Sequence, residues 1–115
     1  MPAFKDIRGE LKPGNPLEAV RKAASGAFRS RGAQSRPICM HGLDLITSVP
    51  FVSVDEVKGQ PYDMVMQPGA TYSIEITPVS ADGTFGIFFS RSFAISGTGV
   101  DELTPYPIDE ILVAG

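Results

Sequence analysis

The residues of this 115-residue chain that could perform chemistry lie in one short segment, CMHGLD, which contains the only cysteine and the only histidine. Cys39, His41 and Asp44 are the residue types of a nucleophile cluster or of a metal site. In an extended strand, alternation places Cys39 and His41 on one face and Asp44 on the opposite face. A structural metal site also takes about four ligands, and the chain has no second cysteine or histidine. We therefore predict no catalytic residue and no metal, only a packed thiol and a histidine near the end of a strand.

Nucleotide cofactors are not indicated either. The glycine-containing segments GTFG and SGTGVDE match neither the G-x-G-x-x-G nor the G-x-x-x-x-G-K-[ST] pattern that opens a phosphate-binding helix. Both segments are typical of turns. The sequence thus predicts a protein that is not an enzyme and that uses no cofactor.

The net charge of the chain, −3, is divided unevenly along it. Residues 1–36 contain eight basic and three acidic side chains, a net charge of +5, whereas residues 37–115 contain two basic and ten acidic ones, a net charge of −8. This division is typical of a basic N-terminal arm joined to an acidic domain, with the boundary between residues 36 and 37. The arm is expected to bind an acidic partner, which is either nucleic acid or a neighbouring protein subunit. The expected contact residues are Arg21, Lys22, Arg29, Arg31 and Arg36.

The arm contains one predicted helix, from about residue 16 to residue 30. Asn15 is a preferred N-cap, and Pro16 suits the first helical position. The preceding residues, 1–14, are punctuated by prolines and glycines and are expected to be extended. Apolar residues recur along the helix at three- and four-residue spacing and form a stripe for contact with another subunit. The stripe consists of Leu17, Val20, Ala24 and Phe28.

From residue 37 onward the pattern changes to about six short antiparallel strands separated by glycine and proline. Residues 72–76 alternate between apolar and polar side chains, and Asp82-Gly83 is a hairpin signal that pairs them with residues 85–95. Further short strands are predicted at residues 38–46, 50–57, 62–66 and 111–114. The predicted fold is mostly β with one N-terminal helix, as an antiparallel β-sandwich or small barrel.

Arg91 interrupts the apolar face of the predicted strand at residues 85–95. Its stem could be buried at the edge of the sheet with the guanidinium in water, or it could pair with a carboxylate across an interface. Ligand binding is the alternative role for this residue.

Part of the β-rich region resembles the filamentous-phage single-stranded DNA-binding proteins, which are small β-barrel dimers. The run DEVKGQPYDMVMQPGATYSIEI and the later GTFGIFF share with them an acidic pair, a G-Q-P turn, a P-G-x-Y strand start and a G-x-F-G motif. The matching residues are Asp55, Glu56, Gly59, Gln60, Pro61, Pro68, Gly69, Tyr72, Gly83, Phe85 and Gly86. The resemblance implies that Phe85 stacks on bases and that Arg91 contacts phosphate. Because a net charge of −8 would repel phosphates, single-stranded nucleic-acid binding is the alternative function.

The architecture as a whole, a small glycine- and proline-rich β-domain with a basic arm, resembles the minor structural proteins of bacteriophage particles, such as decoration, connector or tail components. This resemblance implies a non-enzymatic assembly protein, located in the virion or in the host cytoplasm during assembly. Its partners would be copies of itself or other particle subunits, and nucleic acid could contact the arm. No apolar run approaches the roughly 18 residues of a membrane span, so no membrane partner is expected.

Overall fold

The computed structural model describes residues 2–43 and 50–107 and is mostly β, with two helices. The helices are α1 (Pro2–Gly9) and α2 (Leu17–Arg29). The strands are β1 (Gln34–Ser35), β2 (Ile38–Gly42), β3 (Phe51–Ser53), β4 (Thr71–Ile76), β5 (Pro78–Val79), β6 (Phe89–Ile95) and β7 (Val100–Glu102).

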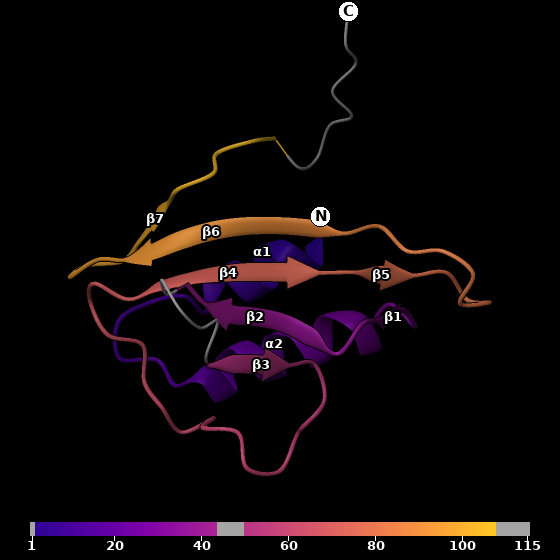
Figure 1. Ribbon diagram of the computed structural model, residues 1–115, viewed down its shortest axis with the longest axis horizontal. Helices are drawn as coiled ribbons and strands as arrows, with labels where there is room; N and C mark the ends of the chain where they lie inside the picture. The colour runs from indigo at the N-terminus through magenta and orange to yellow at the C-terminus, as the bar shows by residue number, and fades with distance from the viewer. Residues whose placement is uncertain (1, 44–49, 108–115) are drawn as a thin grey trace, which may run out of the picture.

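The strands form one main antiparallel sheet of five strands in the order β3-β2-β4-β6-β7. A separate two-stranded sheet pairs β1 with β5. Both helices lie against the same face of the main sheet (Figure 1). Four of the predicted antiparallel strands are therefore present as β2, β3, β4 and β6, but the described residues form a helix layer on one main sheet and neither a sandwich nor a barrel.

The first helix, α1, was not predicted, and the expectation of an extended segment over residues 1–14 is wrong. Pro2 occupies the first helical position, where its missing N–H is no loss. Ala3, Phe4 and Ile7 are buried, and their spacing places them on one face of the helix. An eight-residue helix is not stable in isolation, so packing on the sheet, rather than local propensity, holds α1 in place.

The predicted helix at residues 16–30 is confirmed as α2, one residue shorter at each end. Asn15 does not cap it, because its side-chain amide instead donates hydrogen bonds to the backbone carbonyl and the carboxylate of Glu10. The free N–H groups at the start of α2 are satisfied by the loop before β4. Leu17 N donates to Met64 O at 2.9 Å, and Glu18 N donates to Tyr62 O at 2.9 Å.

This role of the loop explains why the strand predicted at residues 62–66 does not form. Its carbonyls face the start of α2 instead of another strand, and only a single bridge joins Val65 to Pro16. The strand predicted at residues 111–114 lies outside the described residues.

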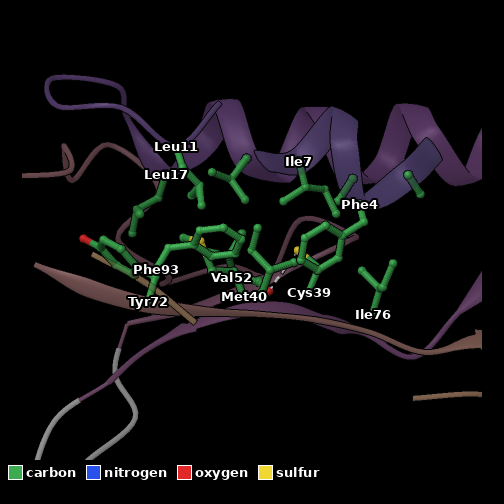
Figure 2. Close-up of a cluster of buried hydrophobic side chains, with 14 of the residues drawn as sticks. Phe4, Ile7, Leu11, Leu17, Cys39, Met40, Val52, Tyr72, Ile76 and Phe93 are labelled. Carbon is green, nitrogen blue, oxygen red and sulfur yellow. Dashed lines mark hydrogen bonds between the residues drawn. The ribbon is translucent and has the colours of Figure 1, made fainter. Parts of the chain in front are cut away.

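The apolar faces of both helices and of the sheet meet in one hydrophobic core (Figure 2). The stripe predicted for contact with another subunit is part of this core, and none of its four side chains is more than 5% exposed. On the sheet side of the core lies the strand with the clearest alternation of apolar and polar residues. Tyr72, Ile74 and Ile76 of β4 all point toward the helices. The core residues are Ala3, Phe4, Ile7, Leu11, Leu17, Val20, Ala24, Ala27, Phe28, Cys39, Met40, Val52, Met66, Tyr72, Ile74, Ile76, Phe93 and Ile95.

The predicted pairing of β4 with β6 is confirmed, with Tyr72 opposite Phe93 and Ile76 opposite Phe89. Strand β6 begins at Phe89, four residues later than the predicted start at Phe85. Between the two strands, the chain forms β5 and a turn in which Gly83 has φ of +72°. The positive φ suits glycine and accounts for the Asp82-Gly83 signal.

Candidate functional site

The face of the main sheet that points away from the helices is largely polar, with Phe51 of β3 beside His41 as an aromatic exception. Cross-strand pairing places His41 of β2 beside Ser73 of β4, and Glu75 of β4 beside Ser90 of β6. Neither described helix lies on this side of the main sheet (Figure 1). We call this surface the open face and define it by His41, Thr71, Ser73, Glu75, Ser90 and Ser92.

The centre of the open face is a contact between His41 and Glu75, which are 34 residues apart in sequence. His41 Nε2 lies 2.9 Å from Glu75 Oε1, and His41 Nδ1 lies 2.8 Å from the carbonyl oxygen of Gly42. Both partners are acceptors, so a protonated ring satisfies both contacts by donating from each nitrogen. The imidazole is 14% exposed and the carboxylate 28% exposed, so the pair lies at the surface but is partly shielded from water.

These contacts raise the pKa of His41 above its ordinary value of 6.5. Burial of the ring lowers this pKa, but the Gly42 carbonyl and the Glu75 carboxylate together outweigh burial. The imidazole beside the Glu75 carboxylate therefore keeps its proton to a higher pH than a free histidine does. Within the described residues, Oε2 of Glu75 makes no hydrogen bond.

Two serines extend the polar network next to this pair. The hydroxyls of Ser73 and Ser90 lie 2.9 Å apart and share a hydrogen bond between β4 and β6. Ser90 is exposed and stands directly across from Glu75. The open face thus presents one carboxylate, one imidazole and the exposed hydroxyl of Ser90 within a few strand positions of one another, while the Ser73 hydroxyl that bonds to Ser90 is buried, at 3% exposure.

Cys39 does not join this face, contrary to the alternation predicted for residues 39 and 41. The register of β2 against β3 shifts between Ile38 and Met40, and both Cys39 and Met40 are fully buried in the core (Figure 2). The thiol donates to the carbonyl oxygen of Val52 at 3.3 Å. Burial raises the pKa of Cys39 to about 12, so this thiol is not a nucleophile near neutral pH. The third member of the predicted cluster, Asp44, lies outside the described residues.

His41 and Glu75 are side chains of the types that ligate transition metals. Among residues 2–43 and 50–107, however, no third histidine, cysteine, aspartate or glutamate completes a metal-binding group with them.

A groove of about 350 Å³ opens at the end of the open face, where β4 stops and β2 and β6 begin. Glu75 forms part of its wall, so the groove is continuous with the His41–Glu75 pair. An adjacent groove of about 380 Å³ shares Arg36, Thr77 and Phe88 with it. The first groove is lined by Arg36, Pro37, Ile38, Glu75, Thr77 and Phe88.

Arg91 and Phe85, assigned to phosphate and base contacts by the DNA-binding resemblance, lie in different environments. Arg91 is on the helix-covered face, with its side chain 10% exposed, where it pairs with Glu102 and stacks on the ring of Phe4. This intrachain pairing with a carboxylate explains why an arginine interrupts an apolar face. Phe85 is 66% exposed and lines the 380 Å³ groove.

Most of the arginines and lysines singled out in the arm contact carboxylates of the same chain. Arg21 pairs with Glu18 at 2.5 Å, and Lys22 approaches the same carboxylate at 3.8 Å. Contacts with a further subunit or with nucleic acid remain a prediction, as does the division of the chain at residue 36. The longer-range pairs join Arg29 to Asp55 at 3.9 Å and Arg31 to Asp6 at 3.4 Å.

The sequence patterns missed Glu75, Ser73 and Ser90 as candidate functional residues. The alternation of TYSIEIT does place Ser73 and Glu75 on the polar side of their strand. Nothing in the sequence alone indicates that this strand pairs with the one that carries His41. The sequence signal for Glu75 was therefore only a carboxylate on the polar side of a strand, a pattern that is common on solvent-exposed sheets.

The chain is similar in sequence to two enzymes, although no protein-family model matches it. It is 29% identical over 104 residues to the dimethylsulfoniopropionate lyase DddP of Roseovarius nubinhibens, and 32% identical over 107 residues to that of Roseobacter denitrificans. Each alignment covers 90% of this chain and 23% of the relative. The chain therefore spans about a quarter of the length of these curated relatives.

The fold is that of part of an aminopeptidase. The described structure matches an X-Pro aminopeptidase from Thermotoga maritima with a TM-score of 0.75 and 19% sequence identity. The match covers 92% of this chain and 29% of the aminopeptidase chain.

These similarities overturn the function predicted from composition and architecture. The chain does not resemble a minor phage particle protein, and the prediction of a non-enzymatic assembly protein in a virion is wrong, because the similar proteins are enzymes. The alternative of a single-stranded nucleic-acid-binding barrel is contradicted by the same findings. None of the described helices is long and apolar enough to cross a membrane.

Proposed function

We propose that this chain takes part in a lyase reaction on dimethylsulfoniopropionate or a closely related sulfonium carboxylate, with the open face as its reactive surface. The observation that carries the proposal is the sequence similarity to two dimethylsulfoniopropionate lyases over 90% of the chain. The structural similarity to an aminopeptidase concerns the fold only and does not indicate a substrate for this chain.

The reaction is an elimination. A base removes a proton from the carbon next to the carboxylate, and a double bond forms between that carbon and its neighbour. The carbon–sulfur bond breaks, and its electron pair leaves with the sulfur as neutral dimethyl sulfide. The other product is acrylate, and the proton remains on the base. The protein must therefore supply one proton acceptor close to the substrate carboxylate.

Glu75 is the group of the open face that fits the role of base. Both ring nitrogens of His41 are engaged with acceptors, so the imidazole has no free lone pair in its protonated form. Glu75 uses only Oε1 in this contact, which leaves Oε2 for the substrate proton. His41 acts as a positioning residue that fixes the orientation of the carboxylate.

The test is the formation of acrylate and dimethyl sulfide from dimethylsulfoniopropionate by the purified chain, measured against the rate in buffer. We expect Glu75→Gln, which keeps the shape of the side chain and removes the proton acceptor, to lower the protein-dependent rate by about 10²-fold or more. The matched control is Asp101→Asn, a carboxylate-to-amide change at an exposed position of β7, which should leave the rate unchanged.

A wild-type rate equal to that in buffer would contradict the proposal, as would a Glu75→Gln variant with full activity. Release of proline-containing product from an Xaa-Pro dipeptide, without any acrylate from the sulfonium compound, would assign a peptidase reaction instead.

A further inference from the structure

We propose that the 350 Å³ groove beside Glu75 is the substrate subsite, in which Arg36 binds the carboxylate and Phe88 binds the cationic sulfonium group. This inference rests on the proposed function and specifies which residues recognise the two charged ends of the substrate. We call the groove the Arg36–Phe88 groove.

The position of the groove follows from the register of the strands. Glu75 pairs with Ser90 and Ile76 with Phe89, so Phe88 follows as the neighbour of Thr77 on the side of the sheet that carries Glu75. Arg36, the residue after β1, reaches the same place because its backbone N–H donates to the carbonyl of Thr77 at 3.1 Å. The proposed base and the two recognition residues therefore line one cavity.

Arg36 differs from the other arginines in the N-terminal part of the chain. Arg21, Arg29 and Arg31 each pair with a carboxylate of this chain. The guanidinium of Arg36 has no ion pair or hydrogen bond to any described residue, and the side chain is exposed at the groove. A guanidinium offers two parallel N–H donors that match a carboxylate, so Arg36 is suited to the anionic end of the substrate.

Phe88 supplies the complementary surface for a cation. It is 60% exposed, which is unusual for a phenylalanine next to a strand, and it lines both grooves. Aromatic rings attract quaternary cations such as choline or methylated lysine through the negative charge of the ring face, and a trialkylsulfonium is likewise a small cation with alkyl groups on its positive centre. Ile38, 40% exposed in the same groove, can contact the methyl groups.

Binding of both charged ends of the substrate would also position the carbon that loses its proton relative to Glu75. The substrate's carboxylate and sulfonium are joined by two methylene carbons, so a molecule held at both ends lies across the groove wall that contains Glu75. The carbon that loses its proton is the one attached to the carboxylate. Binding of the carboxylate by Arg36 would hold this carbon within the groove that Glu75 lines.

The test is calorimetric binding of two isosteric compounds that do not contain a sulfonium leaving group. The first is 3-(trimethylammonio)propionate, which has both charges. The second is 4,4-dimethylpentanoate, in which a neutral carbon replaces the nitrogen. The proposal predicts that the wild-type chain binds the first compound more tightly, because only the first compound presents a cation to Phe88.

Two variants separate the two ends of the site. Arg36→Gln should weaken the binding of both compounds by about 10- to 100-fold, because both contain the carboxylate. Phe88→Leu should weaken 3-(trimethylammonio)propionate by about 3- to 30-fold and change the neutral compound by less than about twofold. The matched control is Arg29→Gln, an arginine that is 77% exposed on α2 and should have no effect.

Equal affinity of the wild type for the two compounds would overturn the assignment of Phe88, and unchanged binding by Arg36→Gln would overturn that of Arg36. Acrylate formation by the wild type together with unaffected binding in both variants would refute the subsite and leave the proposed reaction standing. The predicted binding pattern without acrylate formation would support the subsite and refute the reaction.

Discussion

Replacement of Phe4 by alanine should remove a large part of the stability of the fold. Phe4 is 1% exposed and anchors the eight-residue helix α1 on the sheet (Figure 2). Its ring lies 6.0 Å from that of Phe93, and the guanidinium of Arg91 lies 5.8 Å from its centroid. Truncation of a buried phenylalanine to alanine costs about 3–5 kcal/mol, and total domain stability is about 5–15 kcal/mol. Because α1 is too short to form alone, the loss should lie toward the upper end of that range.

The assay is urea denaturation followed by circular dichroism, with two comparison variants. Phe4→Leu keeps most of the apolar volume and should lose about 1–1.5 kcal/mol of the free energy of unfolding. Lys12→Ala, at an exposed position shortly after the same helix, should change it by less than about 0.5 kcal/mol. A Phe4→Ala variant within about 1 kcal/mol of the wild type would refute the conclusion that α1 is held by its packing on the sheet.

Two further predictions concern groups that titrate. His41 is the only histidine, so its NMR titration is unambiguous, and we expect a midpoint above 6.5 that decreases in Glu75→Gln. Because the pKa of His41 is raised in the folded state, this pair stabilises the fold fully below pH 6.5, and the stabilisation is lost as the pH rises through the folded-state pKa. A titration midpoint at or below 6.5 would contradict the described contacts of His41. Cys39 lies in the core, and its thiol has a pKa of about 12. We therefore expect no reaction with a thiol reagent at pH 8 until the protein is denatured. Immediate labelling of the native chain would show that the thiol is not buried.

Local patterns predicted the parts of the fold that local interactions determine. The three- and four-residue spacing of Leu17, Val20 and Ala24 identified α2, and the alternation in residues 72–76 identified β4 and its buried face. Helix α1 was missed because its two anchors, Phe4 and Ile7, stabilise it only through contact with the sheet.

The candidate site could not be predicted because it depends on pairing between distant strands. His41 and Glu75 meet only when β2 lies beside β4, and the irregular register at Cys39 turns the thiol away from the face that alternation assigns to it. Charge was misleading for a similar reason. The net charge of residues 1–36 does not show which of its charges are already paired, as Arg31 is with Asp6.

The location of the reactive surface can be measured directly by titrating the isotopically labelled chain with dimethylsulfoniopropionate and following the backbone amide signals by NMR. We expect the largest shifts at the open face and the adjoining groove, at Glu75, Thr77 and Ser90, while the signals of α1 and α2 stay in place. Shifts concentrated on the helices, or no shifts at millimolar substrate, would contradict the assignment of the open face as the site where the substrate binds.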